Sequence, residues 1–157
     1  MGKTNAVRLL DAQKIAHKTY EYSAPEGFLD GVSVARSTGF PLEQVFKTLL
    51  VRGGSGEPCV CIIPVAEELD LKKAARHFGE KKLEMLPSRE LTAVTGYIKG
   101  GCSPVGMKKL FRTALDESAL GQKTIVVSAG KVGLQMELAP EDLCRVTKAG
   151  VCPLTLD

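Results

Sequence analysis

Two stretches of this sequence place apolar, β-branched runs on either side of a glycine-containing turn, and this pattern constrains the fold more than any other feature. Residues 44–51, Gln-Val-Phe-Lys-Thr-Leu-Leu-Val, lead through Arg-Gly-Gly-Ser-Gly-Glu-Pro into residues 59–63, Cys-Val-Cys-Ile-Ile. Residues 123–128 and 134–138 repeat the arrangement around Ala-Gly-Lys-Val-Gly. Short apolar runs joined by such turns are typical of β-hairpins. We therefore expect two hairpins.

Helices are expected in small groups between these strands. Capping residues, glycine stops and helical spacing predict helices beginning at Thr4, over 32–38 and 71–78, over 88–94, and over 140–148. Residues 17–22 and 82–85 have the character of short strands, and 23–31 that of a loop. Regular β-α-β alternation is missing, so the order of elements favours an α+β fold with an antiparallel or mixed sheet over a doubly wound one.

Composition narrows the class of protein. A chain of 157 residues with 44% hydrophobic and 25% charged residues fits one globular domain, expected to span 1–157. No apolar run approaches the ~20 residues of a membrane-spanning helix, and the first residues lack a secretory signal, which indicates a cytosolic protein. The formal net charge of +3 is too small to indicate nucleic-acid binding by itself. Only 5% of the residues are aromatic, which argues against a surface that binds single-stranded nucleic acid by base stacking.

The five cysteines do not form a disulfide or zinc framework. None of the pairs among positions 59, 61, 102, 144 and 152 has Cys-x-x-Cys spacing, and only two histidines are available as further ligands. Cys59 and Cys61 are two residues apart, so on a strand they share one face, where buried packing is their expected role. We expect neither a metal nor a cofactor.

Lys47 is the first candidate for a functional residue. It stands within the apolar run Phe-Lys-Thr-Leu-Leu-Val, and strand alternation directs it to the face opposite Phe46 and Thr48. The pattern allows two interpretations: a solvent-facing lysine on a half-exposed strand, or a partly buried ammonium that binds an anion or a carbonyl group.

The second candidate is the loop Gly-Tyr-Ile-Lys-Gly-Gly-Cys-Ser-Pro-Val-Gly at 96–106. Four glycines and a proline exclude a regular helix or central strand, and such a loop brings backbone N–H groups close to an anionic oxygen. It matches neither the Walker nor the dinucleotide pattern, and a purely structural connection is the alternative. The stretch 128–133, Ser-Ala-Gly-Lys-Val-Gly, is the third candidate, although a plain hairpin turn explains it as well.

Conventional nucleophiles find no support in the pattern. Ser103 does not sit in a Gly-x-Ser-x-Gly elbow, and no carboxylate–histidine pairing accompanies it. Cys102 has no histidine nearby in the sequence to act as its base. Asp116 and Glu117 have the character of a turn rather than of an acid–base pair.

Taken together, these three segments resemble the signatures of the YbaK/EbsC family, in order and in spacing, over nearly the whole chain. The resemblance implies a mixed, largely antiparallel, β-barrel-like sheet with flanking helices. It also implies a pocket for the 3′ end of an aminoacyl-tRNA, and removal of cysteine from mischarged Cys-tRNA(Pro), and from Cys-tRNA(Cys), in company with prolyl-tRNA synthetase.

The resemblance also assigns residues to this site. Lys47 corresponds to the family's essential lysine, and the expected substrate-binding residues are Tyr20, Phe28, Gly100, Gly101, Cys102, Ser103, Ser128 and Gly130. Val132 stands where the family commonly has arginine, which removes one positive charge from the turn.

Cysteinyl-tRNA brings its own nucleophile to such a site. A thiol with a pKa near ~8.5 provides a useful thiolate fraction near neutral pH. Its attack on the neighbouring ester carbonyl closes a four-membered thiolactone and expels the 3′ oxygen of the tRNA. Backbone N–H groups of residues 100–103 then stabilise the oxyanion, and Lys47 orients the terminal adenosine or its phosphate, or assists the leaving oxygen. The alternatives are a deacylase of Ala-tRNA(Pro) that uses water, and a non-catalytic module that binds the tRNA acceptor end or regulates the synthetase.

Overall fold

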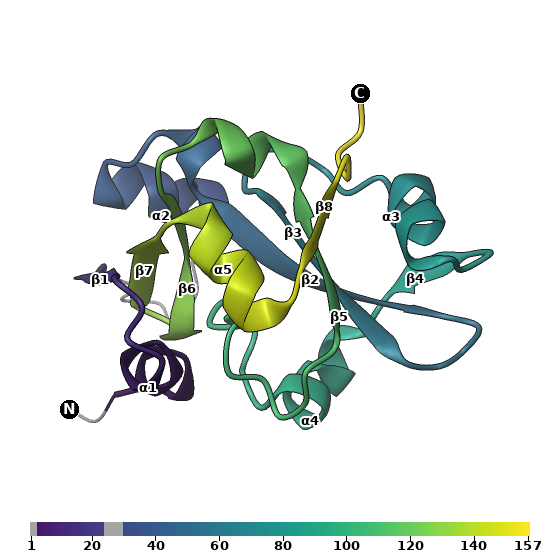
Figure 1. Ribbon diagram of the computed structural model, residues 1–157, viewed down its shortest axis with the longest axis horizontal. Coiled ribbons are helices and arrows are strands. Elements are labelled where there is room, and N and C mark those ends of the chain that lie inside the picture. Colours follow the sequence, from purple (N-terminus) through teal and green to yellow (C-terminus); the bar gives the residue numbers. More distant parts are fainter. Residues whose placement is uncertain (1–2, 24–29) are drawn as a thin grey trace.

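The structure is a computed structural model that describes residues 3–23 and 30–157 (Figure 1). The strands are β1 (Lys18–Glu21), β2 (Phe46–Gly53), β3 (Pro58–Pro64), β4 (Leu83–Met85), β5 (Arg112–Asp116), β6 (Ile125–Lys131), β7 (Leu134–Leu138) and β8 (Gly150–Cys152). The α-helices are α1 (Asn5–Ala12), α2 (Gly31–Thr38), α3 (Leu71–Phe78), α4 (Leu91–Thr95) and α5 (Pro140–Thr147). Short 3₁₀ segments are η1 (Leu42–Gln44), η2 (Ser88–Glu90) and η3 (Glu117–Gly121).

The strands form two sheets, of order β1-β7-β6 and β4-β2-β3-β5-β8. All pairs are antiparallel except β3 with β5 and β5 with β8, which are parallel. The expected α+β class with a mixed, largely antiparallel sheet is thus confirmed. The strands do not close into a barrel, because within residues 3–23 and 30–157 the two sheets are joined by a single isolated bridge between Val45 and Val126.

Both predicted hairpins are present. In the first, β2 and β3 pair from Phe46 with Pro64 to Arg52 with Pro58. In the second, β6 and β7 pair from Ile125 with Leu138, with a register irregularity between Ser128 and Lys131. Their turns need residues that tolerate the left-handed region, and Gly56 (φ +84°) and Gly133 (φ +95°) supply this conformation.

The predicted caps hold the helices in place. The side chain of Thr4 accepts a hydrogen bond from the Val7 N–H at the start of α1, and Asp70 accepts bonds from the first amides of α3. Gly39 and Gly79 adopt left-handed conformations that end α2 and α3. The helix expected over 88–94, with Ser88 as its cap, is instead the 3₁₀ turn η2, which begins at Ser88, followed by the five-residue α4; neither element has a side-chain capping hydrogen bond at its N-cap residue, Pro87 or Glu90.

The predictions missed the two parallel strands β5 and β8. Residues 112–116, Arg-Thr-Ala-Leu-Asp, are buried along both faces except at Arg112, so they show no alternation. Asp116 and Glu117 were expected in a turn; Asp116 ends β5 with 4% of its surface exposed and caps the 3₁₀ turn η3, which begins at Glu117. The Asp116 carboxylate accepts a hydrogen bond from the Ser118 hydroxyl (2.6 Å) within this turn, and one from the Leu154 N–H (2.9 Å), which ties the C-terminal segment to the sheet.

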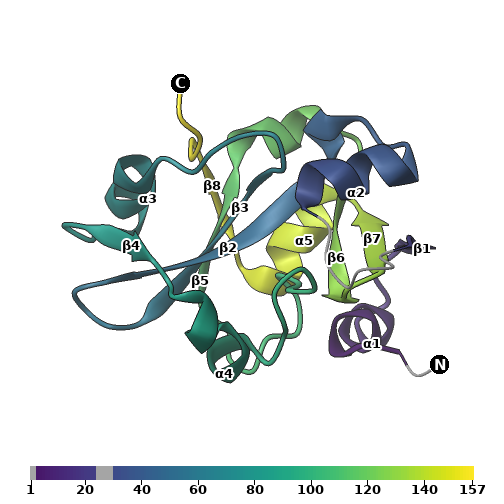
Figure 2. The same ribbon diagram turned by 180° about the vertical axis from the view of Figure 1, so that it is seen from behind.

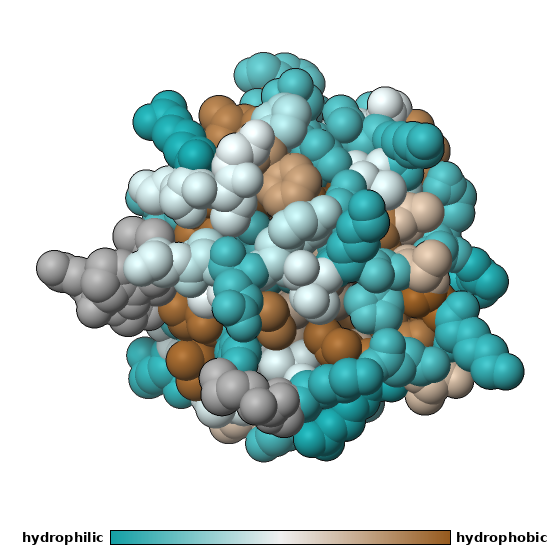
Figure 3. Space-filling model, turned by 90° about the vertical axis from the view of Figure 1, so that its left-hand side faces the viewer, coloured by the Kyte–Doolittle hydropathy of each residue, from teal (hydrophilic) through white to brown (hydrophobic). Residues whose placement is uncertain are grey.

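Helices cover both sheets. One core cluster, which includes Leu10, Ile62 and Leu143, lies where α1 and α5 pack against the sheets. A second cluster, which includes Cys59, Cys61 and Phe78, lies between α3 and the five-stranded sheet. Figure 2 shows α3 and α2 at opposite ends of the molecule. The face with β1 and β7 shows hydrophobic residues as separate patches among hydrophilic ones (Figure 3). Within the described ranges, no helix is long and apolar enough to cross a membrane.

We expect Asp116→Ala to lower the free energy of unfolding by about 1–3 kcal/mol, because it leaves the buried Leu154 N–H without an acceptor. Urea denaturation followed by circular dichroism measures the change. Glu117→Ala, at the exposed neighbouring residue, is the control and should stay within about 0.5 kcal/mol of the parent. Equal stability of the two variants would contradict a structural role for the Asp116 carboxylate.

Candidate active site

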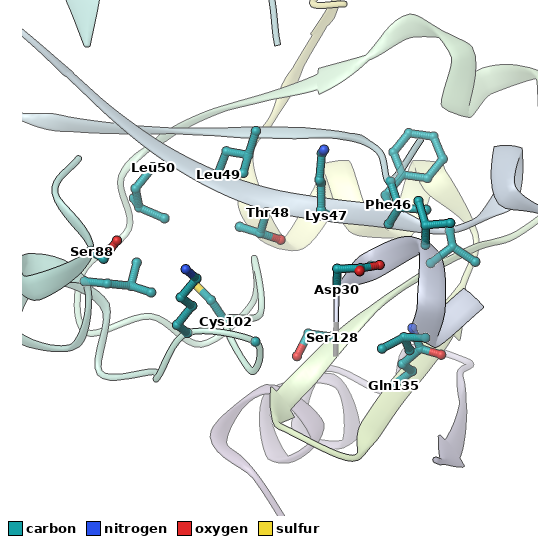
Figure 4. A pocket seen from close by; sticks show the side chains of 18 of the residues that line it. Asp30, Phe46, Lys47, Thr48, Leu49, Leu50, Ser88, Cys102, Ser128 and Gln135 are labelled. Atoms are coloured by element: carbon teal, nitrogen blue, oxygen red, sulfur yellow. The ribbon is translucent and has the colours of Figure 1, made fainter. Parts of the chain in front are cut away.

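A cavity of about 500 Å³ lies beside β2. Its walls come from Phe46–Leu50 of β2, the start of α2, the segment from Met85 to Leu91, the loop 99–102, and the β6–β7 hairpin (Figure 4). This volume lies within the range typical of small-molecule sites. Segments far apart in the sequence therefore converge on one cavity.

The cavity exists because one edge of β2 is left without a partner strand. At its start, β2 is preceded by the bridge from Val45 to Val126, and at its end the Leu50 carbonyl accepts a hydrogen bond from the Leu86 N–H (2.9 Å). Between these points, no strand in the described part of the chain pairs with this edge. In an antiparallel ladder alternate residues direct both backbone groups to the same edge. Thr48, like Leu50, therefore directs its N–H and C=O toward the gap.

Lys47 lies on the opposite side of this strand from Thr48. It pairs across the ladder with Ile63, is half-buried, and lines the cavity. Figure 4 shows its side chain leaving β2 away from Ser128 and Cys102. The predicted alternation of Lys47 and Thr48 is thus confirmed. No ion pair or hydrogen bond within residues 3–23 and 30–157 engages the Lys47 ammonium, so it is available to a ligand.

The glycine loop packs tightly against the β6–β7 turn. A Cβ atom at Gly101 would lie 2.8 Å from the backbone of Lys131 and Val132. Only glycine permits this approach. Gly100 (φ +85°) and Cys102, on either side, line the cavity. Gly101 therefore sets the position of the loop, while its neighbours face the ligand space.

Buried hydrogen bonds support the loop from behind. The Tyr97 hydroxyl donates to the Val105 carbonyl (2.7 Å), and burial raises the pKa of Tyr97 to about 12. Ser103 is fully buried, and its Oγ accepts from the Val105 N–H (3.2 Å). A Cβ atom at Gly130 would lie 3.0 Å from the Tyr97 ring. Ser103 and Gly130 thus pack behind the loop and are not among the cavity-lining residues.

Cys102 is the one thiol among the described residues that line the cavity. Burial raises the pKa of this thiol to about 11, so it stays protonated near neutral pH. No histidine is among the described lining residues. A protonated thiol without a base is a poor nucleophile.

Tyr20 and Phe28 are the aromatic residues predicted to bind the substrate. The Tyr20 hydroxyl donates to Glu137 (2.6 Å), its ring packs edge-on against Phe40, and it does not line the cavity. Tyr22, two residues later, does line it. Phe28 lies outside the described residues.

The structure brings Lys47, Gly100, Cys102 and Ser128 of the predicted residues together in the cavity. It adds polar residues that the sequence reasoning missed: Asp30, Thr48 and Gln135. Asp30 could have been found as the N-cap of α2, where it accepts from the Ser33 N–H (2.8 Å). For Thr48 and Gln135 no pattern distinguished them from ordinary strand residues.

The chain belongs to the aminoacyl-tRNA editing domain family, whose sequence profile matches residues 30–146. The match includes β2, the glycine loop and the β6–β7 hairpin, which are the main walls of the cavity.

Curated relatives agree with this family. The "Putative Cys-tRNA(Pro)/Cys-tRNA(Cys) deacylase EbsC" of Enterococcus faecalis is 48% identical over 153 residues, 98% of this chain and 93% of that protein. The resemblance to the YbaK/EbsC family is thereby confirmed. A proline–tRNA ligase of Nitratidesulfovibrio vulgaris is 29% identical over 130 residues, which are 76% of this chain and 22% of the ligase.

Solved structures share the fold over the whole chain. The crystal structure described as "a putative trans-editing enzyme for prolyl tRNA synthetase" superposes with a TM-score of 0.83 at 25% identity, covering 100% of both chains. The hypothetical protein APE2540 superposes with a TM-score of 0.89 at 20% identity, covering 98% of this chain and 100% of that one. The second likeness concerns the fold alone.

We expect Gly101→Ala to destabilise the protein by about 1–3 kcal/mol, since the new methyl group would press on the backbone of Lys131 and Val132. Chemical denaturation gives the magnitude. Gly54→Ala is the matched control, because a Cβ atom there meets nothing within 4 Å. Should both variants unfold at the same denaturant concentration, the loop and the hairpin turn are not in tight contact.

Proposed function

We propose that this protein removes cysteine from Cys-tRNA(Pro), and from Cys-tRNA(Cys), and that the thiol of the substrate is the nucleophile. The observation that carries the proposal is the chemistry of the cavity wall. Its described residues include no histidine, and Cys102 is protonated near neutral pH. The family and the relative EbsC support an aminoacyl-tRNA substrate.

The substrate supplies the reactive group. In the cysteinyl ester the sulfur is attached to Cβ, and Cβ is attached to the Cα that carries the ester carbonyl. A fraction of the thiol is present as thiolate near neutral pH. The sulfur attacks the ester carbonyl carbon, the C–O bond to the tRNA 3′ oxygen breaks, and the thiol proton passes to that oxygen. The products are a four-membered thiolactone, which water later opens, and free tRNA.

The glycine loop then needs to stabilise the oxyanion. The Gly101 N–H is already donated to the Ile98 carbonyl (3.0 Å), so it is not available. The N–H groups of Gly100 and Cys102 have no partner among the described residues, and both residues line the cavity. These two amides are therefore the proposed oxyanion donors.

Lys47 acts on the nucleotide side of the substrate in this proposal. Its ammonium leaves β2 away from Ser128 and Cys102 (Figure 4), and no protein group neutralises it within the described ranges. A terminal phosphate or the leaving 3′ oxygen carries the negative charge that a lysine binds best.

Prolyl-tRNA synthetase is the proposed partner. A net charge of +3 offers little electrostatic attraction for tRNA, so a synthetase that already holds the tRNA would deliver the acceptor end. The similarity to part of a proline–tRNA ligase supports an association with proline tRNA. A soluble location in the cytoplasm, where translation takes place, follows from this function.

Purified protein should deacylate Cys-tRNA(Pro) at least about tenfold faster than Ser-tRNA(Pro), because a hydroxyl is the weaker nucleophile, and should spare Ala-tRNA(Pro). Release of radiolabelled amino acid gives the rates, and mass spectrometry detects the thiolactone. Cys102→Ala is the control and should retain activity. Equal rates for the three esters would favour attack by water. An inactive Cys102→Ala variant would favour a protein nucleophile. Binding without turnover would favour a non-catalytic module.

Lys47→Ala should reduce kcat/KM for Cys-tRNA(Pro) by about 100-fold or more while circular dichroism stays unchanged. Lys72→Ala, which removes an exposed lysine of α3, is the matched control. A rise in KM identifies a role in binding the adenosine or phosphate, and a fall in kcat identifies assistance to the leaving oxygen. Full activity of Lys47→Ala would make this lysine a plain surface residue.

A further inference from the structure

Two buried oxygen atoms of cavity residues have no hydrogen-bond partner within residues 3–23 and 30–157. They are Oγ1 of Thr48 and Oε1 of Gln135, and Gln135 is only 6% exposed. Both residues line the cavity. Leaving a buried acceptor unsatisfied costs about 1–3 kcal/mol, so such groups are rare in native proteins and most often await a ligand or water.

Several other groups that line the cavity can accept hydrogen bonds, and the lining also includes the cations Lys47 and Lys99. Ser128 lies directly opposite Gln135 in the β6–β7 ladder, and its Oγ accepts a bond from the Gly130 N–H (3.2 Å). Asp30 lines the same cavity, and hydrogen bonds from Ser33 hold the pKa of its carboxyl below the usual range. The Thr48 carbonyl faces the gap beside β2, as the ladder alternation requires. We refer to Asp30, Thr48, Ser128 and Gln135 as the acceptor wall.

We infer that the acceptor wall binds a primary ammonium group, the α-ammonium of the aminoacyl ester. This inference rests on the proposed function for the identity of the ligand. An ammonium carries three donors and no acceptor, so it satisfies several oxygen atoms at once. A hydroxyl offers one donor, and an anion would be repelled by the Asp30 carboxylate.

Binding the ammonium there orients the whole substrate. Figure 4 shows Asp30, Ser128 and Gln135 on one side of β2, while Lys47 extends to the other. Three members of the acceptor wall and the Lys47 ammonium therefore lie on different sides of β2. An aminoacyl ester fits with its ammonium on the first side and its phosphate on the second. The ester carbonyl, which lies between these groups, is then brought near the amides of Gly100 and Cys102.

Two inert analogues test this inference: 3′-deoxy-3′-(L-alanylamino)adenosine and 3′-deoxy-3′-(propanoylamino)adenosine, which differ only in the amino group. Calorimetry at pH 6, where the amine is protonated, should give at least about tenfold tighter binding of the first analogue, because a charged hydrogen bond contributes about 1.5–3 kcal/mol. Gln135→Met and Thr48→Val, which keep side-chain size but remove the acceptor, should reduce this ratio to about threefold or less. Gln122→Met, at a residue that does not line the cavity, should leave it unchanged.

Equal affinity of the wild-type protein for the two analogues would overturn the inference, as would an unchanged ratio in both variants. Deacylation of Cys-tRNA(Pro) by the same preparations separates this result from the proposed function. Turnover without ammonium selectivity contradicts the inference alone. Ammonium selectivity without turnover contradicts the deacylase proposal alone and leaves the acceptor wall as an ammonium site.

Discussion

The unpaired edge of β2 is the constraint on which the rest of the structure depends. This strand is joined to β6 just before it begins and pairs with β4 at its end, and no strand in the described part of the chain pairs with the short segment between them. A bare edge inside a protein would leave backbone groups unsatisfied. Here the edge opens into a cavity instead, where solvent or a ligand can meet those groups. One short stretch of β2 therefore contains Lys47, the Thr48 side chain, and the backbone N–H and C=O groups of Thr48 and Leu50 that face the gap.

Contact between two loops keeps this cavity in shape. The glycine loop and the β6–β7 turn approach so closely at Gly101 that a single methyl group would have no room. Buried hydrogen bonds from Tyr97 and Ser103 hold the loop from behind. Donors for an oxyanion must be fixed before the reaction begins if they are to lower its barrier. The packing behind the loop is therefore as much a part of the site as the residues that line it.

Local patterns predicted most of the fold, because hairpins and helix caps depend on residues close in sequence. Thr4, Asp70, Gly39 and Gly79 all act as their positions indicated. The parallel strands β5 and β8 were not predicted, because their pairing is not local: β5 pairs with β3, about fifty residues earlier in the chain, and β8 pairs with β5.

The site was predicted in part for the same reason. Lys47 and the glycine loop stand out because lysine in an apolar strand and clustered glycines are unusual. Sequence alone does not separate a glycine that faces a ligand from one that packs against a neighbour, so Gly130 was expected in the site although it packs on Tyr97. Gln135 was missed because a glutamine alternating with apolar residues in a strand is ordinary. Its importance comes from an unsatisfied oxygen, which only the three-dimensional packing reveals.

The described residues of the site offer amides, hydroxyls, one protonated thiol and the side chains of Lys47 and Asp30, but no histidine that could act as a base near neutral pH. Such a site can bind several aminoacyl esters and still leave most of them intact, because the rate depends on what the bound ester itself can do. In the proposed mechanism a prolyl or alanyl ester, which has no thiol, would bind without attack on its carbonyl. Small amino acids are difficult to separate by pocket size, since one methylene group changes affinity by only about 1–3 kcal/mol. Discrimination by reactivity would avoid that limit: the proposed ammonium site would orient esters with a primary α-ammonium, such as the alanyl and cysteinyl esters, and the sulfur would decide which one is cleaved.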